Sequence, residues 1–260
     1  MMALALLVRH SAFQAPRLTA VTARMLSGDG AERYEAYLTL LRRGWRNHLL
    51  GVGMLHNRYF ALRHGESEAN VAHLISCLPD FESGLAHGLS PQGHEQAARS
   101  HLDLNALLGS GLNLASTHIY ASDFRRTVET AEHLREGLGL PLAALSLTAA
   151  LRERSFGPLN LQDDGLYPSV WEDDAAFEFG GRGVEPAAAV QARASSFIAG
   201  LEASMEGQTI VLVGHGDLLQ IMQTAFEAVP ASEHRSLPHL AQCELRELTL
   251  RGGAATAPDA

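Results

Sequence analysis

The chain has no lysine, and all twenty of its basic residues are arginine. This excludes catalysis through a lysine Schiff base and excludes the lysine of a phosphate-binding P-loop. Only two cysteines occur, Cys77 and Cys243, which are too few for a disulfide framework in 260 residues. A reducing compartment fits this count, which says nothing for or against a metal site.

Long apolar runs and a surplus of positive charge are also missing. No apolar run approaches the roughly 18 residues that span a membrane, so we expect a soluble protein without a membrane span. The net charge is -9 at pH 7, which argues against nucleic acid or an anionic membrane surface as the main partner. An anionic ligand would therefore need a local positive pocket.

Acidic residues are absent before Asp29, in a segment that carries Arg9, Arg17 and Arg24 among serines and threonines. This composition is typical of an organellar transit peptide, and a disordered or helical terminal extension is the alternative. The expected localisation is cytoplasmic, or mitochondrial or plastid if 1–28 is a transit peptide. We divide the chain into an N-terminal extension over 1–56, a main domain over 57–250 and a tail over 251–260. The extension is expected to contain one helix, at 31–43.

Strands and helices alternate along the main domain. Strands are expected where short runs of β-branched, aromatic and other apolar residues occur, at 59–62, 117–121, 142–149, 209–213 and, at a sheet edge, 243–250. Helices are expected between them, at 90–108, from 122 to about 137, at 186–205 and up to 226. The alternation predicts a three-layer α/β/α sandwich with a mostly parallel sheet.

Helix caps and one long loop complete this outline. Ser90 is the expected N-cap before Pro91, and Asp217 is the expected N-cap of the helix that ends at Phe226. A polar loop with two Asp pairs is predicted over 158–185. Loops of this length usually shape or cover a site, or are disordered.

Two predicted strands end in a histidine next to glycine. The first ends in Arg63, His64 and Gly65, and the strand at 209–213 is followed by His215 between two glycines. Open α/β sheets keep ligand-contacting groups at the carboxyl ends of their strands. Arginine offers a fixed cation for a phosphate or carboxylate, and imidazole titrates near neutral pH. The two strand ends therefore suit transfer chemistry on an anionic substrate.

Arg125 and Arg126 fall in the first turn of a predicted helix, after the strand at 117–121. Arginine opposes the helix dipole at this position, and an anion bound at the helix end would resolve the conflict. A solvent-facing arginine pair is the alternative.

Five pieces of the sequence, in this order, resemble the histidine phosphatase superfamily, the phosphoglycerate-mutase-like proteins, over roughly 57–250. The matching pieces are 62–67 with Asn70, 89–93, 122–126 with 130–131, 151–153 and 213–216. The resemblance implies that the fold is phosphoglycerate-mutase-like and that the protein is an enzyme of phosphate transfer.

The same resemblance implies roles for single residues. His64 would be the nucleophile that becomes a phosphohistidine, and Glu153 matches the position of the proton donor. Arg63, Arg126 and His215 would surround the phosphoryl group.

Three residues that follow His64 complete the implied site. Asn70 would donate to the phosphoryl group from the turn, and Gly65 is expected to let the backbone approach closely. Ser67 either lines the pocket or caps a helix. The other histidines, His234 and His239 among them, are expected to be structural or surface residues.

These roles set chemical requirements. His64 must be neutral to attack, so its second nitrogen needs an acceptor such as a backbone carbonyl. His215 is more useful protonated, and Glu153 needs a raised pKa to donate a proton and then activate water. Neither a metal nor another cofactor is expected.

The reaction remains open between hydrolysis and a mutase. The mutase branch of the family that this chain resembles has a longer insertion with basic residues for the substrate carboxylate. Here the interval from Glu153 to His215, 215 - 153 = 62 positions, is short and acidic, with arginine only at 154, 182 and 193. By this resemblance a phosphatase acting on a small phosphorylated metabolite or a phosphoprotein is favoured, because a mutase must retain its phosphorylated intermediate product and exclude water. Two alternatives remain. One is a family member without catalytic activity that acts by binding a partner, and the other is a serine hydrolase whose nucleophile elbow, the turn that carries the serine, lies at 65–69. The sequence does not predict the oligomeric state.

Overall fold

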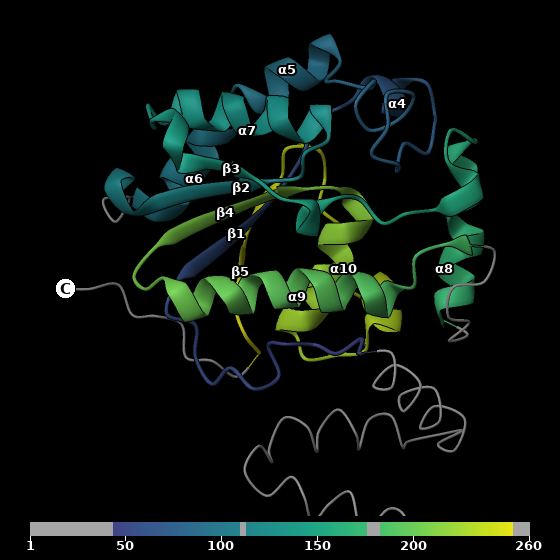
Figure 1. The fold of residues 1–260 in the computed structure, drawn as a ribbon. Coiled ribbons are helices and arrows are strands. Elements are labelled where there is room, and N and C mark those ends of the chain that lie inside the picture. The colour runs from purple at the N-terminus through teal and green to yellow at the C-terminus, as the bar shows by residue number, and fades with distance from the viewer. Residues whose placement is uncertain (1–43, 110–112, 176–182, 252–260) are drawn as a thin grey trace, which may run out of the picture.

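The computed structural model describes residues 44–109, 113–175 and 183–251 (Figure 1). Its strands are β1 (Arg58–Arg63), β2 (Thr117–Ala121), β3 (Leu145–Leu147), β4 (Thr209–Gly214) and β5 (Leu245–Leu248). They form one sheet in the order β3-β2-β4-β1-β5, with only β5 antiparallel to its neighbour. The predicted mostly parallel sheet with an antiparallel edge strand is confirmed.

Helices cover both faces of the sheet (Figure 1). One face carries α5 (Pro91–Ala97), α6 (Ser100–Leu108) and α7 (Arg125–Gly137), and the other carries α9 (Ala187–Ser204) and α10 (Gly216–Phe226). Two short helices, α4 (Glu68–Val71) and α8 (Tyr167–Ala175), lie near the carboxyl ends of the strands. Short 3-10 helices are η2 (Leu114–Ser116), η3 (Leu142–Ala144), η4 (Ala149–Leu151), η5 (Gly157–Leu159), η6 (Asp164–Leu166) and η8 (Ala231–Ser236). The predicted three-layer α/β/α sandwich is confirmed.

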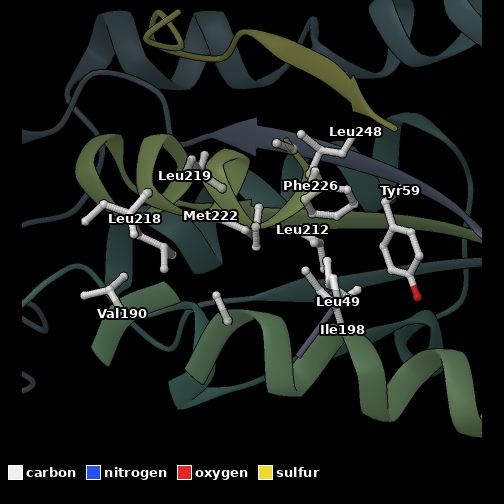
Figure 2. Packing of buried hydrophobic residues seen from close by; sticks show 14 of the residues in the cluster. Leu49, Tyr59, Val190, Ile198, Leu212, Leu218, Leu219, Met222, Phe226 and Leu248 are labelled. Carbon is white, nitrogen blue, oxygen red and sulfur yellow. The ribbon is translucent and has the colours of Figure 1, made fainter. Parts of the chain in front are cut away.

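The core forms on both faces because the central strands alternate their apolar side chains between them. Tyr59 and Leu212 point toward α9 and α10, where they pack with Ile198, Met222 and Phe226 (Figure 2). The intervening residues of β1 and β4 pack against α6 and α7 in a second cluster. Burial on both faces fixes the register of β1 against β4, and this register positions the residues that follow them.

The predicted helix over 90–108 is wrong in one respect, since it is broken into α5 and α6. Ser90 caps α5 as expected, by accepting a hydrogen bond from Gly93 N, and Pro91 is its first residue. The Ser100 hydroxyl donates to the carbonyl of Ala97 at 2.7 Å, so this carbonyl is satisfied without a continuing helix.

Two other helix starts differ from the prediction. Phe124 is the N-cap of α7, so Ser122 and Asp123 precede the helix rather than open it. His215 is the N-cap of α10, and Asp217 lies within its first turn with its carboxylate bonded to Trp171 and Arg154. Asp217 thus bonds to side chains of distant segments instead of capping its own helix.

The segment 158–185 was expected to be a loop, yet it contains α8 as well as η6. Few residues of α8 are buried, Val170 and Asp174 among them, so the sequence gives little apolar periodicity. The predicted helix at 31–43, the candidate transit segment and most of the tail lie outside the described residues. Within the described residues, no helix is long and apolar enough to cross a membrane.

Part of the predicted N-terminal extension packs on the main domain. Leu49 belongs to the core cluster between the sheet, α9 and α10. The Asn47 amide donates to the Ala225 carbonyl at 2.9 Å, and the backbone N–H of His48 donates to Ser195 Oγ at 3.0 Å. The domain boundary at 56 stays a prediction.

Candidate active site

The candidate site is a cavity of about 190 Å³ at the carboxyl ends of the strands. Arg63, the last residue of β1, is opposite Gly214, the last residue of β4. His64 and His215 therefore follow at the same level of the sheet, with ring centroids 5.2 Å apart. The residues lining the cavity come from six segments: Arg63, His64, Ser67, Ala69, Asn70, Leu74, Ser76, Arg126, Glu153, Asp164, Tyr167, Trp171, Gly216, Asp217 and His239.

Arg126 joins the two histidines. Its Nε donates to His64 Nε2 at 3.2 Å and its Nη2 donates to His215 Nδ1 at 3.0 Å. A further bond from Nη2 to the Ser76 carbonyl, at 2.8 Å, fixes the guanidinium, and the residue is only 3% exposed. Arg125 instead pairs with Glu129 at the surface, at 2.8 Å. Arg126 is thus buried in the site, whereas Arg125 belongs to a solvent-exposed ion pair.

His64 has the acceptor that a neutral nucleophile requires. Its Nδ1 lies 2.6 Å from the Gly65 carbonyl, so Nδ1 carries the proton and the lone pair of Nε2 is left to accept the hydrogen bond from Arg126 Nε. Burial holds the pKa of His64 well below its usual value, and the charges of Arg126 and Arg63 lower it further. The imidazole is therefore neutral near pH 7.

His215 differs from the sequence-based expectation. Both its nitrogens are bonded, Nδ1 to Arg126 and Nε2 to Ser122 Oγ at 2.9 Å. Arg126 can only donate, so Nδ1 accepts and Nε2 carries the proton. Burial, followed by the charge of Arg126, also lowers the pKa of His215 well below its usual value. The expectation of a protonated His215 is wrong for this state, and the charge of this end of the cavity comes from arginine.

Arg63 keeps one donor without a protein partner. Its Nη1 contacts the Leu240 carbonyl and His239 Nε2, both at 2.9 Å. Its Nε is buried and has no hydrogen-bond partner among the described residues. An unpaired buried donor is costly, so this atom is suited to a bound anion.

Glu153 lines the same cavity just after η4. Its Oε1 accepts hydrogen bonds from the backbone of Arg154 at 2.9 Å and of Leu218 at 3.0 Å. Burial raises the pKa of Glu153, the nearby charge of Asp217 raises it further, and the two backbone bonds act in the opposite direction. This is the direction that an acid catalyst needs.

The remaining predicted residues have structural roles as well. Ser67 is the N-cap of α4 in a capping box with Asn70, whose Oδ1 accepts from both the backbone and the hydroxyl of Ser67, and both residues line the cavity. Gly65 does not line it. A Cβ on Gly65 would lie 2.6 Å from the Gly93 carbonyl, so its close approach is to α5 rather than to a ligand.

Sequence reasoning missed nine of the fifteen lining residues. They are Ala69, Leu74, Ser76, Asp164, Tyr167, Trp171, Gly216, Asp217 and His239. Tyr167 and Trp171 stack with ring centroids 5.6 Å apart, and their spacing of four on a helix was hidden by the expectation of a loop. No signal in the sequence marks His239.

A buried ion cluster holds α8 against α10. Arg154 is 2% exposed and pairs bidentately with Asp174, at 2.6 and 2.7 Å, and with Asp217 at 3.2 Å. Asp217 also accepts from Trp171 Nε1 at 3.0 Å. The helix that carries Tyr167 and Trp171 is thus fixed to the turn that follows β4. No cluster of three or more potential metal ligands occurs in the part of the chain that the structure describes.

Comparison with known proteins identifies the family. The model of the histidine phosphatase superfamily (branch 1) matches residues 59–258. A 2,3-bisphosphoglycerate-dependent phosphoglycerate mutase of Bartonella tribocorum is 23% identical over 185 residues, which are 66% of this chain and 82% of that protein.

Solved structures agree in fold. Mycobacterial glucosyl-3-phosphoglycerate phosphatase complexed with VO3 is 26% identical with a TM-score of 0.60, over 74% of this chain and 92% of that one. YhfR of Bacillus stearothermophilus is 23% identical with a TM-score of 0.60, over 76% and 98%. The match over residues 59–258 shows that this chain belongs to the histidine phosphatase superfamily.

Proposed function

We propose that the protein hydrolyses phosphomonoesters through a phosphohistidine on His64. The observation that carries the proposal is the geometry at this residue, where Nδ1–H is bonded to a backbone carbonyl, Nε2 accepts from Arg126, and the side chain lines a cavity together with Arg63 and Arg126. Arg63, Arg126, Asn70 and Glu153 keep the roles that the family resemblance implies, and His215 acts in its neutral form.

In the first step Arg126 Nε exchanges its hydrogen bond to His64 Nε2 for one to a phosphoryl oxygen. The freed Nε2 lone pair attacks phosphorus, and the bond from phosphorus to the ester oxygen breaks. Arg63 and Arg126 stabilise the negative charge on the three equatorial oxygens. Protonated Glu153 gives its proton to the leaving oxygen, which departs as an alcohol. The Gly65 carbonyl stabilises the Nδ1–H of the phosphorylated ring.

In the second step Glu153, now a carboxylate, takes a proton from water while the water oxygen attacks phosphorus. The bond from phosphorus to Nε2 breaks, His64 returns to its neutral form and inorganic phosphate leaves. Glu153 ends the cycle protonated. The burial that raises its pKa supports both halves of this cycle.

The engagement of two arginines supports a phosphatase over a mutase. Arg154 is bonded to Asp174 and Asp217, and Arg193 pairs with Glu185 at 2.9 Å. Neither lines the cavity, so neither is placed to bind a carboxylate of the substrate. The third arginine of this interval, Arg182, lies outside the described residues.

Trapping of the phosphoenzyme tests the proposal. With chelator present, the protein should hydrolyse p-nitrophenyl phosphate and form an acid-labile, base-stable phosphoryl label, and His64→Asn should lose both. His133→Asn, which changes a histidine outside the cavity, is the matched control. An unlabelled but active protein would contradict the proposal.

Three further outcomes separate the alternatives. Interconversion of phosphoglycerates primed by 2,3-bisphosphoglycerate would favour the mutase, and no turnover of any ester would favour a silent binding member. Loss of activity in Ser67→Ala but not in His64→Asn would favour the serine hydrolase.

A further inference from the structure

The charges that line the cavity are divided by position. Its two cations, Arg63 and Arg126, flank His64. Three carboxylates line it as well, those of Glu153, Asp164 and Asp217. The chain has no lysine, and no other arginine is among the described residues that line the cavity.

Hydrogen bonds within the site hold both arginines in place. Arg126 is held by hydrogen bonds to His64, His215 and Ser76, and Arg63 by bonds to Leu240 and His239. His239 does not add a cation, because burial and the charge of Arg63 lower its pKa to about 4. A phosphoryl group on His64 would therefore take up the positive charge of the cavity, leaving none for a second anionic group.

Asp217 is the second of these carboxylates whose charge is only partly compensated. Arg154 is its ionic partner, but the same guanidinium is paired bidentately with Asp174. One buried cation thus serves two buried carboxylates. The other arginine at α8, Arg235, is exposed, lies 3.7 Å over the Trp171 ring and does not line the cavity.

Asp164 places another carboxylate on the lining, at the start of η6. Its backbone N–H donates to the His73 carbonyl at 3.0 Å, which ties η6 to the segment just after α4. Its side chain is 38% exposed and lies 3.4 Å from the His73 imidazole, which is a cation only when protonated. Asp164 therefore presents its charge to a group that is bound in the cavity.

We propose that the alcohol half of the substrate is uncharged or cationic, and that Asp164 selects against a second anionic group. This inference rests on the proposed phosphatase function. It predicts a preference for small hydroxylated or amino alcohols over substrates that carry a carboxylate, because an unpaired anion beside Asp164 and Asp217 is repelled without compensation.

A charge series of small esters tests the inference. We would measure kcat/KM for phosphoethanolamine, glycerol 3-phosphate and 3-phosphoglycerate, with p-nitrophenyl phosphate as the general substrate. Glycerol 3-phosphate and 3-phosphoglycerate differ mainly in one group, which is a hydroxymethyl group in the first and a carboxylate in the second. We expect kcat/KM for 3-phosphoglycerate to be lower than for glycerol 3-phosphate by about tenfold or more.

Variants of Asp164 then assign the preference. Asp164→Asn should bring the kcat/KM ratio of glycerol 3-phosphate to 3-phosphoglycerate closer to one. Asp164→Lys should bring this ratio closer still or reverse the preference. Glu172→Gln removes an exposed carboxylate of α8 that does not line the cavity, and should leave the ratio as in the parent protein.

The outcomes distinguish this inference from the function on which it rests. If p-nitrophenyl phosphate is hydrolysed but 3-phosphoglycerate is used as well as the other two esters, or if none of the three is used, the inference is overturned and the phosphatase proposal stands. An equal ratio in the parent and both Asp164 variants also overturns it. No hydrolysis of p-nitrophenyl phosphate or any of the three esters rejects the proposed function, and the inference with it.

Discussion

At the scale of single residues, the site combines two imidazoles, two guanidinium groups and one carboxyl group whose protonation states follow from burial. Burial, and after it the charges of the arginines, keep both His64 and His215 neutral by lowering their pKa. The same burial favours the protonated form of Glu153. Burial thus shifts Glu153 toward its protonated form and both imidazoles toward their neutral forms, which are the forms that the proposed first step requires.

Replacing Glu153 by glutamine tests this assignment. Because glutamine cannot protonate a leaving alkoxide, kcat/KM for glycerol 3-phosphate should fall by about 10² to 10⁴. The fall should be much smaller for p-nitrophenyl phosphate, whose leaving group departs without a proton. The parameter kcat/KM is chosen because it covers only the transfer to His64. Equal losses with both esters would speak against the acid role.

At the scale of elements, the site depends on how closely α5 approaches the end of β1. A Cβ on Gly93 would lie 1.9 Å from the Glu66 carbonyl, and one on Gly65 would lie 2.6 Å from the Gly93 carbonyl. Both neighbours are backbone atoms, so neither can move aside cheaply. This contact supports the peptide whose carbonyl fixes the His64 tautomer.

Gly93→Ala should therefore cost both stability and activity. We expect a loss of about 2 to 4 kcal/mol in the free energy of unfolding, as for overpacking against backbone, together with a lower kcat. Gly200→Ala is the matched control, because it lies in α9 with nothing within 4 Å of the added Cβ. Helix propensity predicts that this control is stabilised by up to about 1 kcal/mol. Urea unfolding of the two variants beside the parent makes the comparison.

At the scale of the whole molecule, the sequence predicted the order of strands and helices better than it predicted the residues that line the cavity. The order of strands and helices and the position of His64 and His215 follow from apolar runs that end in polar turns. Asp217 was predicted to be a helix cap because capping is local, while its actual partners Trp171 and Arg154 are 46 and 63 positions away. Contacts of this range leave no mark in a pattern of neighbouring residues. The helix α8 was missed for the same reason, since Asp174 pairs with Arg154 and Val170 packs with Ile75 and Phe156, all of them on distant segments.

The pH dependence of stability is a property of the whole chain. Burial lowers the pKa of His64, His215 and His234 below the ordinary 6.5, so below that pH the unfolded chain binds protons that the folded chain does not. Stability is therefore fully present above pH 6.5 and is lost as the pH falls, by up to about 1.4 kcal/mol per pH unit for each such histidine. Glu153 acts in the opposite sense, because a raised pKa contributes stability that is lost as the pH rises.

His64→Gln should make this slope smaller by up to about 1.4 kcal/mol per pH unit. The measurement is the free energy of unfolding in urea at several pH values between 5 and 7 in one buffer system of constant ionic strength. His56→Gln, which replaces a histidine whose side chain is 52% exposed, serves as the control. A parent protein more stable at pH 5 than at pH 7 would contradict the prediction.

The position of β4 between β1 and β2, and the bond from Arg63 to the Leu240 carbonyl, have a consequence for biosynthesis. A nascent chain presents β1 to the solvent before its central partner β4, which follows some 150 residues later, since Arg58 pairs with Thr209. Arg63 meets its carbonyl partner Leu240 later still. The proposed activity should thus appear only after Leu240 has left the ribosome, so that products that stop before it are inert toward phosphate esters.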